Sequence, residues 1–185
     1  MNNVLDPMAA RFLRYLRVER NDSPNTILNY KDDLIAFSVF LSGRGKATWL
    51  EVSLLDIRSY LAQLHREEKA RRTIARRISS LRSFYRYLMR EGLTDKNPFT
   101  KVKTPKLEKK LPVFLEEFEM NHLLELPDLS TELGQRDRAL LEFLYSTGCR
   151  VSELVGLTLT RLDLSNRYAL LLGKGHKERI VPLGH

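Results

Sequence analysis

The sequence has one cysteine, one tryptophan and no long apolar run. A single thiol, that of Cys149, excludes a disulfide within the chain. The first residues lack the apolar stretch of a secretory signal. A membrane-spanning helix needs about 20 mostly apolar residues, and the sequence offers no such segment. We therefore expect a protein of the cytosol or the nucleus.

Acidic residues are scarce in the first part of the chain. Residues 1–112 contain 23 lysines and arginines against 12 acidic residues, whereas residues 113–185 contain 8 against 11. With 185 residues and 43% hydrophobic content, this change of charge predicts two small domains, each with its own core. The net charge of +8 indicates a polyanionic partner, without choosing among DNA, RNA and anionic lipid.

The stretch at residues 95–112, DKNPFTKVKTPKLEKKLP, combines six lysines with three prolines. Proline removes a backbone donor and disfavours helix in the residue before it. We therefore predict an extended, basic connector between a helical domain at 1–94 and a second domain at 113–185.

Apolar residues recur at steps of three and four in four segments of the first domain, which predicts four helices. The first covers residues 8–20, and the second begins after Ser23 as N-cap, with Pro24 in its first turn. The third begins at a capping box formed by Ser53 and Asp56. The fourth covers about 70–91 and ends at Gly92.

The second domain is predicted to be mixed. Helices are expected at 116–126, from 134 to the stop at Gly148, and from Arg150 to Val155. Alternating apolar residues and turn signals then predict short strands at 162–164, 168–172 and 178–182, which would form a small antiparallel sheet.

The predicted fourth helix is the most basic segment. Seven arginines lie between residues 70 and 90, where the sequence has no acidic residue. Arginines without partners repel one another, and their planar forks suit phosphate oxygens and guanine edges. We predict nucleic-acid contact, with a log-log salt slope near −5 if about six phosphates are neutralised. The alternative is an ordinary solvated basic face.

Two single cations, Arg150 and Lys174, could likewise either bind a phosphate or have an ordinary structural or solvated role. Arg150 follows a glycine break and lies three residues before Glu153, so it could form a helical salt bridge or bind a phosphate. Lys174 lies between two glycines at a predicted hairpin tip, where it could reach into a groove or remain a solvated turn residue. The local pattern leaves both choices open.

Several segments, in order, resemble the Xer-type tyrosine recombinases of the phage-integrase family. They are TGCRVSELVGL, LLLGKGHKERIVPLG and the upstream TIARRISSLRSFYRYLMREG, together with the pattern NP…PK…LP. The resemblance covers essentially the whole chain. It implies a mainly α, two-domain protein: a four-helix SAM-like core-binding domain, the connector, and the N-terminal part of a mixed α+β catalytic domain.

The resemblance also implies roles for particular residues. Arg150 matches the first catalytic arginine, which grips the scissile phosphate, and Lys174 matches the hairpin lysine, which protonates the leaving 5′ oxygen. Glu153 matches the acidic residue that holds the arginine. Cations expected to contact DNA are Arg71, Arg72, Arg76, Arg77, Arg82, Lys101 and Lys103.

In this family a tyrosine attacks DNA to form a 3′-phosphotyrosyl bond, with no metal and no cofactor. The implied partner is double-stranded DNA. Complete relatives form tetramers on two DNA sites, some with a paralogous recombinase, by exchanging C-terminal helices, whereas we expect this chain to be a monomer. The implied setting is the cytoplasm of a prokaryote, for chromosome dimer resolution or integration of a mobile element.

The sequence departs from the family pattern at the remaining catalytic positions. It has no later His-x-x-Arg pair and no tyrosine in the nucleophile's place, and the similar run at 176–179 falls in the hairpin, so we interpret it as a decoy. We therefore expect DNA binding without cleavage. The alternatives are a non-catalytic DNA-binding regulator and a metal-dependent nuclease. For the nuclease, the adjacent carboxylates at 32–33 and 116–117 would diverge around a helix.

Overall fold

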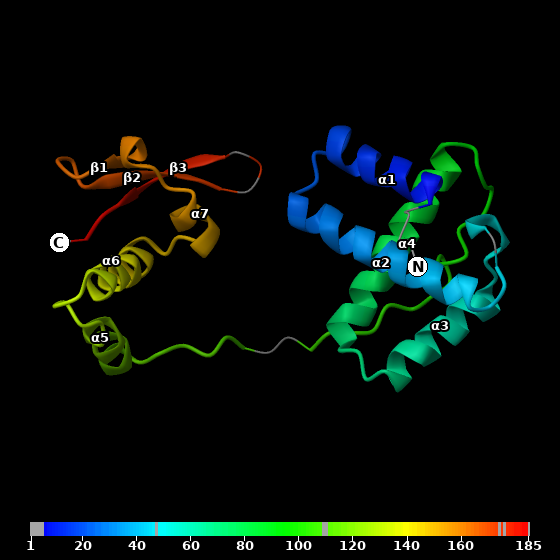
Figure 1. The fold of residues 1–185 in the computed structure, drawn as a ribbon, viewed down its shortest axis with the longest axis horizontal. Coiled ribbons are helices and arrows are strands. Elements are labelled where there is room, and N and C mark those ends of the chain that lie inside the picture. Colours follow the sequence, from blue (N-terminus) through cyan, green and yellow to red (C-terminus); the bar gives the residue numbers. More distant parts are fainter. Residues whose placement is uncertain (1–5, 47, 109–110, 174, 176, 185) are drawn as a thin grey trace. The chain divides into compact units, whose positions relative to one another are not determined.

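The computed structural model describes residues 6–46, 48–108, 111–173, 175 and 177–184 (Figure 1). The chain divides into two compact units, Met1–Lys109 and Lys110–His185. Within the described residues, no helix combines the length and the apolar character needed to cross a membrane.

Unit 1 is helical, as predicted. Its elements are α1 (Pro7–Val18), α2 (Pro24–Ser42), a 3-10 turn η1 (Trp49–Glu51), α3 (Leu54–Arg66) and α4 (Arg71–Arg90). The predicted caps are confirmed, because the Ser23 hydroxyl accepts from the Thr26 N–H and the capping box of Ser53 and Asp56 is complete. Gly92 follows α4 with a φ of 68°, a conformation that favours glycine.

The core of unit 1 lies among its four helices, with α1 and α2 packed against α4 (Figure 1). The stripes predicted from helical spacing are buried, including Phe12, Phe37, Ile57 and Ile78. Aromatic rings fill much of this core, with centroids of Phe12 and Phe84 5.4 Å apart. The unit therefore has a well-packed apolar interior of its own.

The predicted connector begins as part of that core. Phe99 is fully buried against the helices, and Val102 packs beside it. Arg82 of α4 donates to the Phe99 carbonyl at 3.2 Å, the Val102 carbonyl at 2.6 Å and the Thr104 hydroxyl at 3.3 Å. The chain from 99 to 104 is thus fastened to α4, whereas the sequence predicted an extended connector from residue 95. The burial of Phe99 holds this segment against α4, although the prolines and lysines around it predicted an extended connector.

Unit 2 combines three helices with a sheet. The elements are α5 (Glu117–Glu125), α6 (Glu132–Thr147), α7 (Val151–Val155), the 3-10 turn η2 (Leu159–Arg161), β1 (Leu162–Asp163), β2 (Tyr168–Leu172) and β3 (Glu178–Pro182). The strands pair antiparallel in the order β1-β2-β3, as predicted (Figure 1). Gly148 ends α6 with a φ of 58°, so that the chain turns into α7.

The core of unit 2 is small. Its buried apolar residues are Cys149, Ala169, Leu171 and Val181, with Phe143 and others packed partly against them. Cys149 is thus a buried apolar residue. Both α6 and α7 contact the sheet, α6 against β3 and α7 against β2. These contacts bring the turn between α6 and α7 close to the hairpin of β2 and β3.

The contacts of Arg82 lead to a stability prediction. We expect Arg82→Ala to lower the free energy of unfolding of unit 1 by about 1–3 kcal/mol, because two backbone carbonyls lose a charged donor. Hydrogen exchange should increase in residues 99–104. The matched control is Arg86→Ala on the exposed side of the same helix, which we expect to change stability by less than about 0.5 kcal/mol. Equal losses from both substitutions would contradict the role given to Arg82.

Candidate functional site

The arginines of α4 are not the unpartnered row that the sequence predicted. Arg76 donates to Asp33 Oδ2 at 2.7 Å and to the Asn29 carbonyl at 2.9 Å, both on α2. Arg77 donates to the Tyr60 hydroxyl at 3.0 Å, and its Nε lies 3.6 Å from Asp33 Oδ1. The assumption of a row without partners was wrong, because acceptors from α2, α3 and the segment after α4 reach these side chains.

Asp33 is the acceptor at the centre of this arrangement. Its side chain is only 1% exposed, and Ser80 of α4 also donates to it at 2.9 Å. Burial raises the pKa of this carboxyl, while the hydrogen bond from Ser80 and the charges of Arg76 and Arg77 act in the opposite direction. The two arginines therefore serve to accommodate a buried acid between α2 and α4.

Other cations of unit 1 remain available to an external anion. The side chain of Arg71 is 70% exposed and faces Glu108 at 3.3 Å, an exposed pair of little energetic weight. Arg72 is exposed and has no partner within the described residues, and Lys101 and Lys103 are also exposed. The predicted DNA-contacting set thus divides into cations whose head groups are held by α2, α3 or the segment after α4 and cations that are exposed.

In unit 2, Glu153 gathers two arginines. Its Oε2 accepts from the backbone N–H of Arg150 at 2.8 Å, and its Oε1 accepts from Arg150 Nη1 at 3.0 Å. Arg179 of β3 donates to the same carboxylate through both terminal nitrogens, each at 2.8 Å. The Glu153 side chain is 3% exposed, whereas that of Arg150 is 70% exposed. The structure therefore presents one guanidinium to solvent above a buried carboxylate.

The electrostatics of this cluster keep Glu153 ionised. Its pKa is lowered to about 2, first by the hydrogen bonds from Arg179 and then by the backbone N–H of Arg150. The pairing of Arg150 with Glu153 uses one terminal nitrogen, and no other described residue takes its remaining donors. Those donors can bind an oxyanion in the two-point geometry that guanidinium favours.

Arg179 belongs to this cluster, although the sequence suggested only a decoy motif at 176–179. Arg179 pairs with Leu171 across the sheet, so both lie on the face that also carries the buried Ala169 and Val181. Ile180, the apolar neighbour, is 68% exposed instead. Side chains alternate between the two faces along β3, so Arg179, two residues before the buried Val181, lies on the same face as Val181. This alternation is the sequence signal that could have identified Arg179.

Lys174, the other predicted catalytic residue, lies outside the described residues, but the base of its hairpin is described. The Gly173 N–H donates to the Lys177 carbonyl at 2.7 Å. A Cβ on Gly173 would lie 3.3 Å from Glu153 Oε1, closer than side chains normally pack. The hairpin base therefore approaches the Glu153 carboxylate directly, and glycine permits this approach.

Tyrosines in the described structure mostly serve packing. Tyr60 and Tyr85 are 2% exposed, and the Tyr85 hydroxyl donates to the Trp49 carbonyl at 2.6 Å. Burial raises the pKa of Tyr60 above its usual value despite the nearby charge of Arg77. In unit 2, by contrast, Tyr145 is 54% exposed and Tyr168 is 37% exposed.

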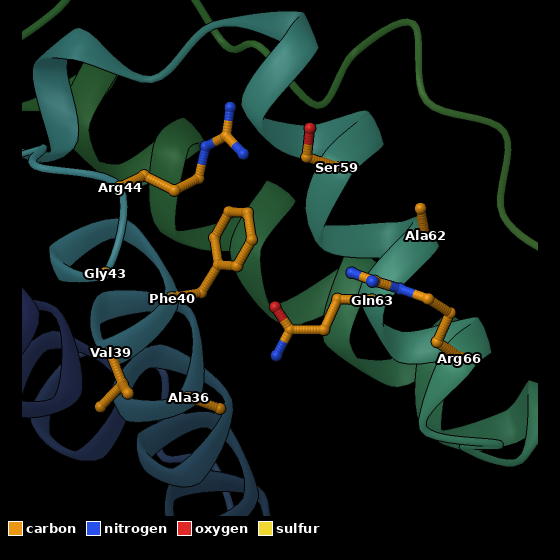
Figure 2. Close-up of a pocket in the computed structure, with 9 residues that line it drawn as sticks. All are labelled: Ala36, Val39, Phe40, Gly43, Arg44, Ser59, Ala62, Gln63 and Arg66. Atoms are coloured by element: carbon orange, nitrogen blue, oxygen red, sulfur yellow. The ribbon is translucent and has the colours of Figure 1, made fainter.

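Unit 1 has a groove between α2 and α3 with a volume of about 540 Å³ (Figure 2). Phe40 from α2 and Gln63 from α3 extend into it from opposite sides. Arg44 at its rim already pairs with Asp56 at 3.3 Å. The groove lacks a carboxylate, a histidine or a cysteine, so its lining offers no acid–base pair.

A metal-dependent site receives no support from the described residues, among which no group of three or more His, Cys, Asp or Glu side chains could hold an ion. Of the two adjacent acidic pairs named above, the pair at 32–33 is divided between the interior and the surface. Asp33 is buried against two arginines, whereas Asp32 beside it is exposed.

Comparison with protein families gives two matches. The phage integrase N-terminal SAM-like domain matches residues 9–92, and the phage integrase family matches residues 113–185. The two matched regions correspond to the two structural units and leave the connector between them.

Curated relatives extend this result. The chain is 44% identical over 182 residues to tyrosine recombinase XerC of Oceanobacillus iheyensis, covering 98% of this chain and 60% of the relative. It is 51% identical over 178 residues to XerC of Pelotomaculum thermopropionicum, covering 94% of this chain and 58% of that relative. The chain thus spans somewhat more than half the length of these relatives.

Solved structures share the fold. A lambda integrase dimer bound to a COC′ core site superposes with a TM-score of 0.72 at 20% identity, covering 95% of this chain and 47% of that one. The Tn1549 transposon integrase in complex with circular intermediate DNA gives a TM-score of 0.63 at 23% identity, covering 96% and 61%. Taken with the two domain matches and the XerC relatives, the chain belongs to the phage integrase family of tyrosine recombinases.

Proposed function

We propose that this chain is the DNA-binding part of a Xer-like tyrosine recombinase and that it carries two of the catalytic side chains, Arg150 and Lys174. The complete recombinase would cut and rejoin double-stranded DNA through a 3′-phosphotyrosyl intermediate. Its biological task would be the resolution of chromosome dimers in the cytoplasm of a prokaryote. Tetramers on two DNA sites, with a paralogous partner recombinase, would be the working assembly.

The observation that carries this proposal is the presentation of Arg150. Its guanidinium is 70% exposed but is tethered from behind by a buried carboxylate. A phosphate attacked by a nucleophile gains charge on its non-bridging oxygens, and a fixed guanidinium stabilises that charge without losing its own proton. Loss of one such donor typically costs about 2.7–4 kcal/mol of the reaction barrier.

Lys174 would supply the proton for the leaving 5′ oxygen. Support comes from the hairpin base, since Gly173 lies against the carboxylate that holds Arg150. The chain therefore passes close to the Arg150 turn at Gly173, the residue before Lys174. General acid catalysis of this kind requires the donor to reach the leaving oxygen directly or through one water.

DNA binding would rest mainly on the exposed cations. We assign direct phosphate contacts to Arg71, Arg72, Lys101 and Lys103, which are exposed. Arg76, Arg77 and Arg82 would contribute positive potential, because their head groups already donate to acceptors within the protein. This division explains how α4 accommodates so many arginines within a folded unit.

The salt dependence of DNA binding tests this division between exposed cations and arginines that are bound within the protein. We expect Arg72→Ala to reduce the magnitude of the log-log salt slope of duplex binding by about 0.9, because one phosphate contact is lost. Fluorescence anisotropy with a labelled duplex at several salt concentrations measures the slope. The matched control, Arg136→Ala, removes the same charge from α6, where Arg136 pairs with its neighbour Asp137 at 2.7 Å. An equal change in the control would mean that only total charge matters.

Cleavage chemistry is tested with a suicide substrate, a Xer-type site nicked near the cleavage position. We expect no covalent protein–DNA adduct from the 185-residue chain on a denaturing gel. A chimera extended with the His-x-x-Arg pair and the tyrosine of a XerC relative should form the adduct. Arg150→Ala should slow that reaction by about 10²–10³-fold.

Other outcomes of this experiment would change the proposal. An adduct from the short chain would show that a tyrosine already present acts as nucleophile, and Tyr145→Phe and Tyr168→Phe would identify it. No adduct from the chimera on any Xer site would favour a non-catalytic DNA-binding protein with the recombinase fold.

The pKa of Glu153 leads to a prediction about acid stability. A carboxyl whose pKa is lowered on folding stabilises the folded state above its ordinary pKa of 4.5, and this contribution is lost as the pH falls from 4.5 toward 2. Unit 2 should therefore lose stability over that range, and Glu153→Gln should remove part of the loss. Backbone amide NMR signals of β2 (Tyr168–Leu172), followed in urea at each pH, report unfolding of unit 2. Glu142→Gln, at an exposed pair with Arg138, is the control.

A further inference from the structure

Arg179 has a further role in the Arg150 site, which rests on the proposed function of Arg150. We propose that Arg179 is a positioning residue for phosphate binding: it acts through Glu153, and it keeps the Arg150 site both fixed and positively charged. Its own guanidinium would make no contact with DNA.

The geometry of the carboxylate supports this role. Both Glu153 oxygens accept from Arg179, at 2.8 Å each, and both also accept from Arg150, through its backbone N–H and its Nη1. A two-point contact between guanidinium and carboxylate fixes the plane of the carboxylate. Since Arg150 is bound to that same plane, its position depends on Arg179.

The charges of the cluster give a second reason. Glu153 and Arg150 alone would sum to zero, and a phosphate held by Arg150 would lie close to a carboxylate that repels it. Arg179 restores a net charge of +1 to the three residues. Its side chain is 39% exposed, but both terminal nitrogens are engaged by Glu153. The residue thus compensates a charge without competing for the phosphate.

The cluster also joins the two parts of the proposed active site. Arg179 belongs to β3 and Arg150 begins α7, and their only link through side chains in the described structure is Glu153. At the base of the hairpin that carries Lys174, a Cβ on Gly173 would lie 3.3 Å from Glu153 Oε1 and 3.6 Å from Arg179 Nη1. Through Glu153, Arg179 therefore links the hairpin to the turn that carries Arg150.

A double-mutant cycle on the 185-residue chain tests the role of Arg179. Affinity for a fluorescently labelled duplex is measured for Arg150→Ala, Arg179→Gln and the double variant. We expect each single variant to bind about tenfold more weakly, as for the loss of a charge-assisted hydrogen bond. The double variant should bind within about twofold of Arg150→Ala, and all three should lose about 0.9 from the salt slope.

Two further variants separate positioning from direct contact and from misfolding. Arg179→Lys keeps the charge but cannot make the two-point contact, so it should recover only part of the affinity. Glu153→Gln combined with Arg179→Gln removes the carboxylate together with its partner, leaves Arg150 as a net cation, and should also recover affinity. Labelling of Cys149 reports whether each variant keeps unit 2 folded. If Arg179→Gln is unfolded, the paired Glu153→Gln and Arg179→Gln variant and Arg179→Lys decide the result.

The outcomes distinguish the two proposals. No effect of Arg150→Ala on DNA affinity would overturn the phosphate contact, and the role of Arg179 with it. A loss with Arg150→Ala but none with Arg179→Gln would overturn only the inference about Arg179. Additive losses in folded variants would mean that Arg179 contacts DNA itself. A folded paired variant that binds no better than Arg179→Gln would overturn the charge-balancing role.

Discussion

A carboxylate removed from water needs nearby positive charge and hydrogen-bond donors, and each unit of this protein places a pair of arginines beside one buried acid. In unit 1 the acid is Asp33, with Arg76 and Arg77 from α4. In unit 2 it is Glu153, with Arg150 and Arg179. The consequences differ, because the arginines around Asp33 are turned inward, whereas Glu153 leaves most of Arg150 in solvent. The same constraint therefore produces a structural contact in one unit and an anion-binding side chain in the other.

Much of the fold was predictable because its signals are local. The helices of unit 1 follow from apolar spacing and from caps such as Ser23 and Ser53, and the strands of unit 2 follow from alternation between turn residues. The contacts of Arg76 and Arg82 were not predictable, since they join residues 43 and 17–22 positions apart. Phe99 was missed for a related reason: its burial depends on how the chain returns to α4 after Gly92. A count of charges along one helix cannot reveal acceptors supplied by another segment.

In the candidate site, too, the sequence predicts contacts between neighbouring residues but not contacts between distant segments. Arg150 and Glu153 are three residues apart, so their pairing could be read directly from the sequence. Arg179 is 26 positions from Glu153, and its contact depends on the register of the β2–β3 hairpin. A shift of one residue in that register would turn Arg179 to the opposite face and bring Ile180 inward. The site therefore depends on strand pairing, which a motif search does not test.

The two interpretations of Arg150 offered by the sequence, a salt bridge and a phosphate-binding residue, turn out to be compatible. An unattached arginine on an exposed turn would lose considerable side-chain entropy on binding a phosphate. The bond to Glu153 fixes the guanidinium before any ligand arrives, and it occupies the side facing the protein. The salt bridge thus lowers the ordering cost of the proposed phosphate contact. This advantage requires that the carboxylate stay ionised and that its charge be balanced, which are the two conditions that Arg179 meets.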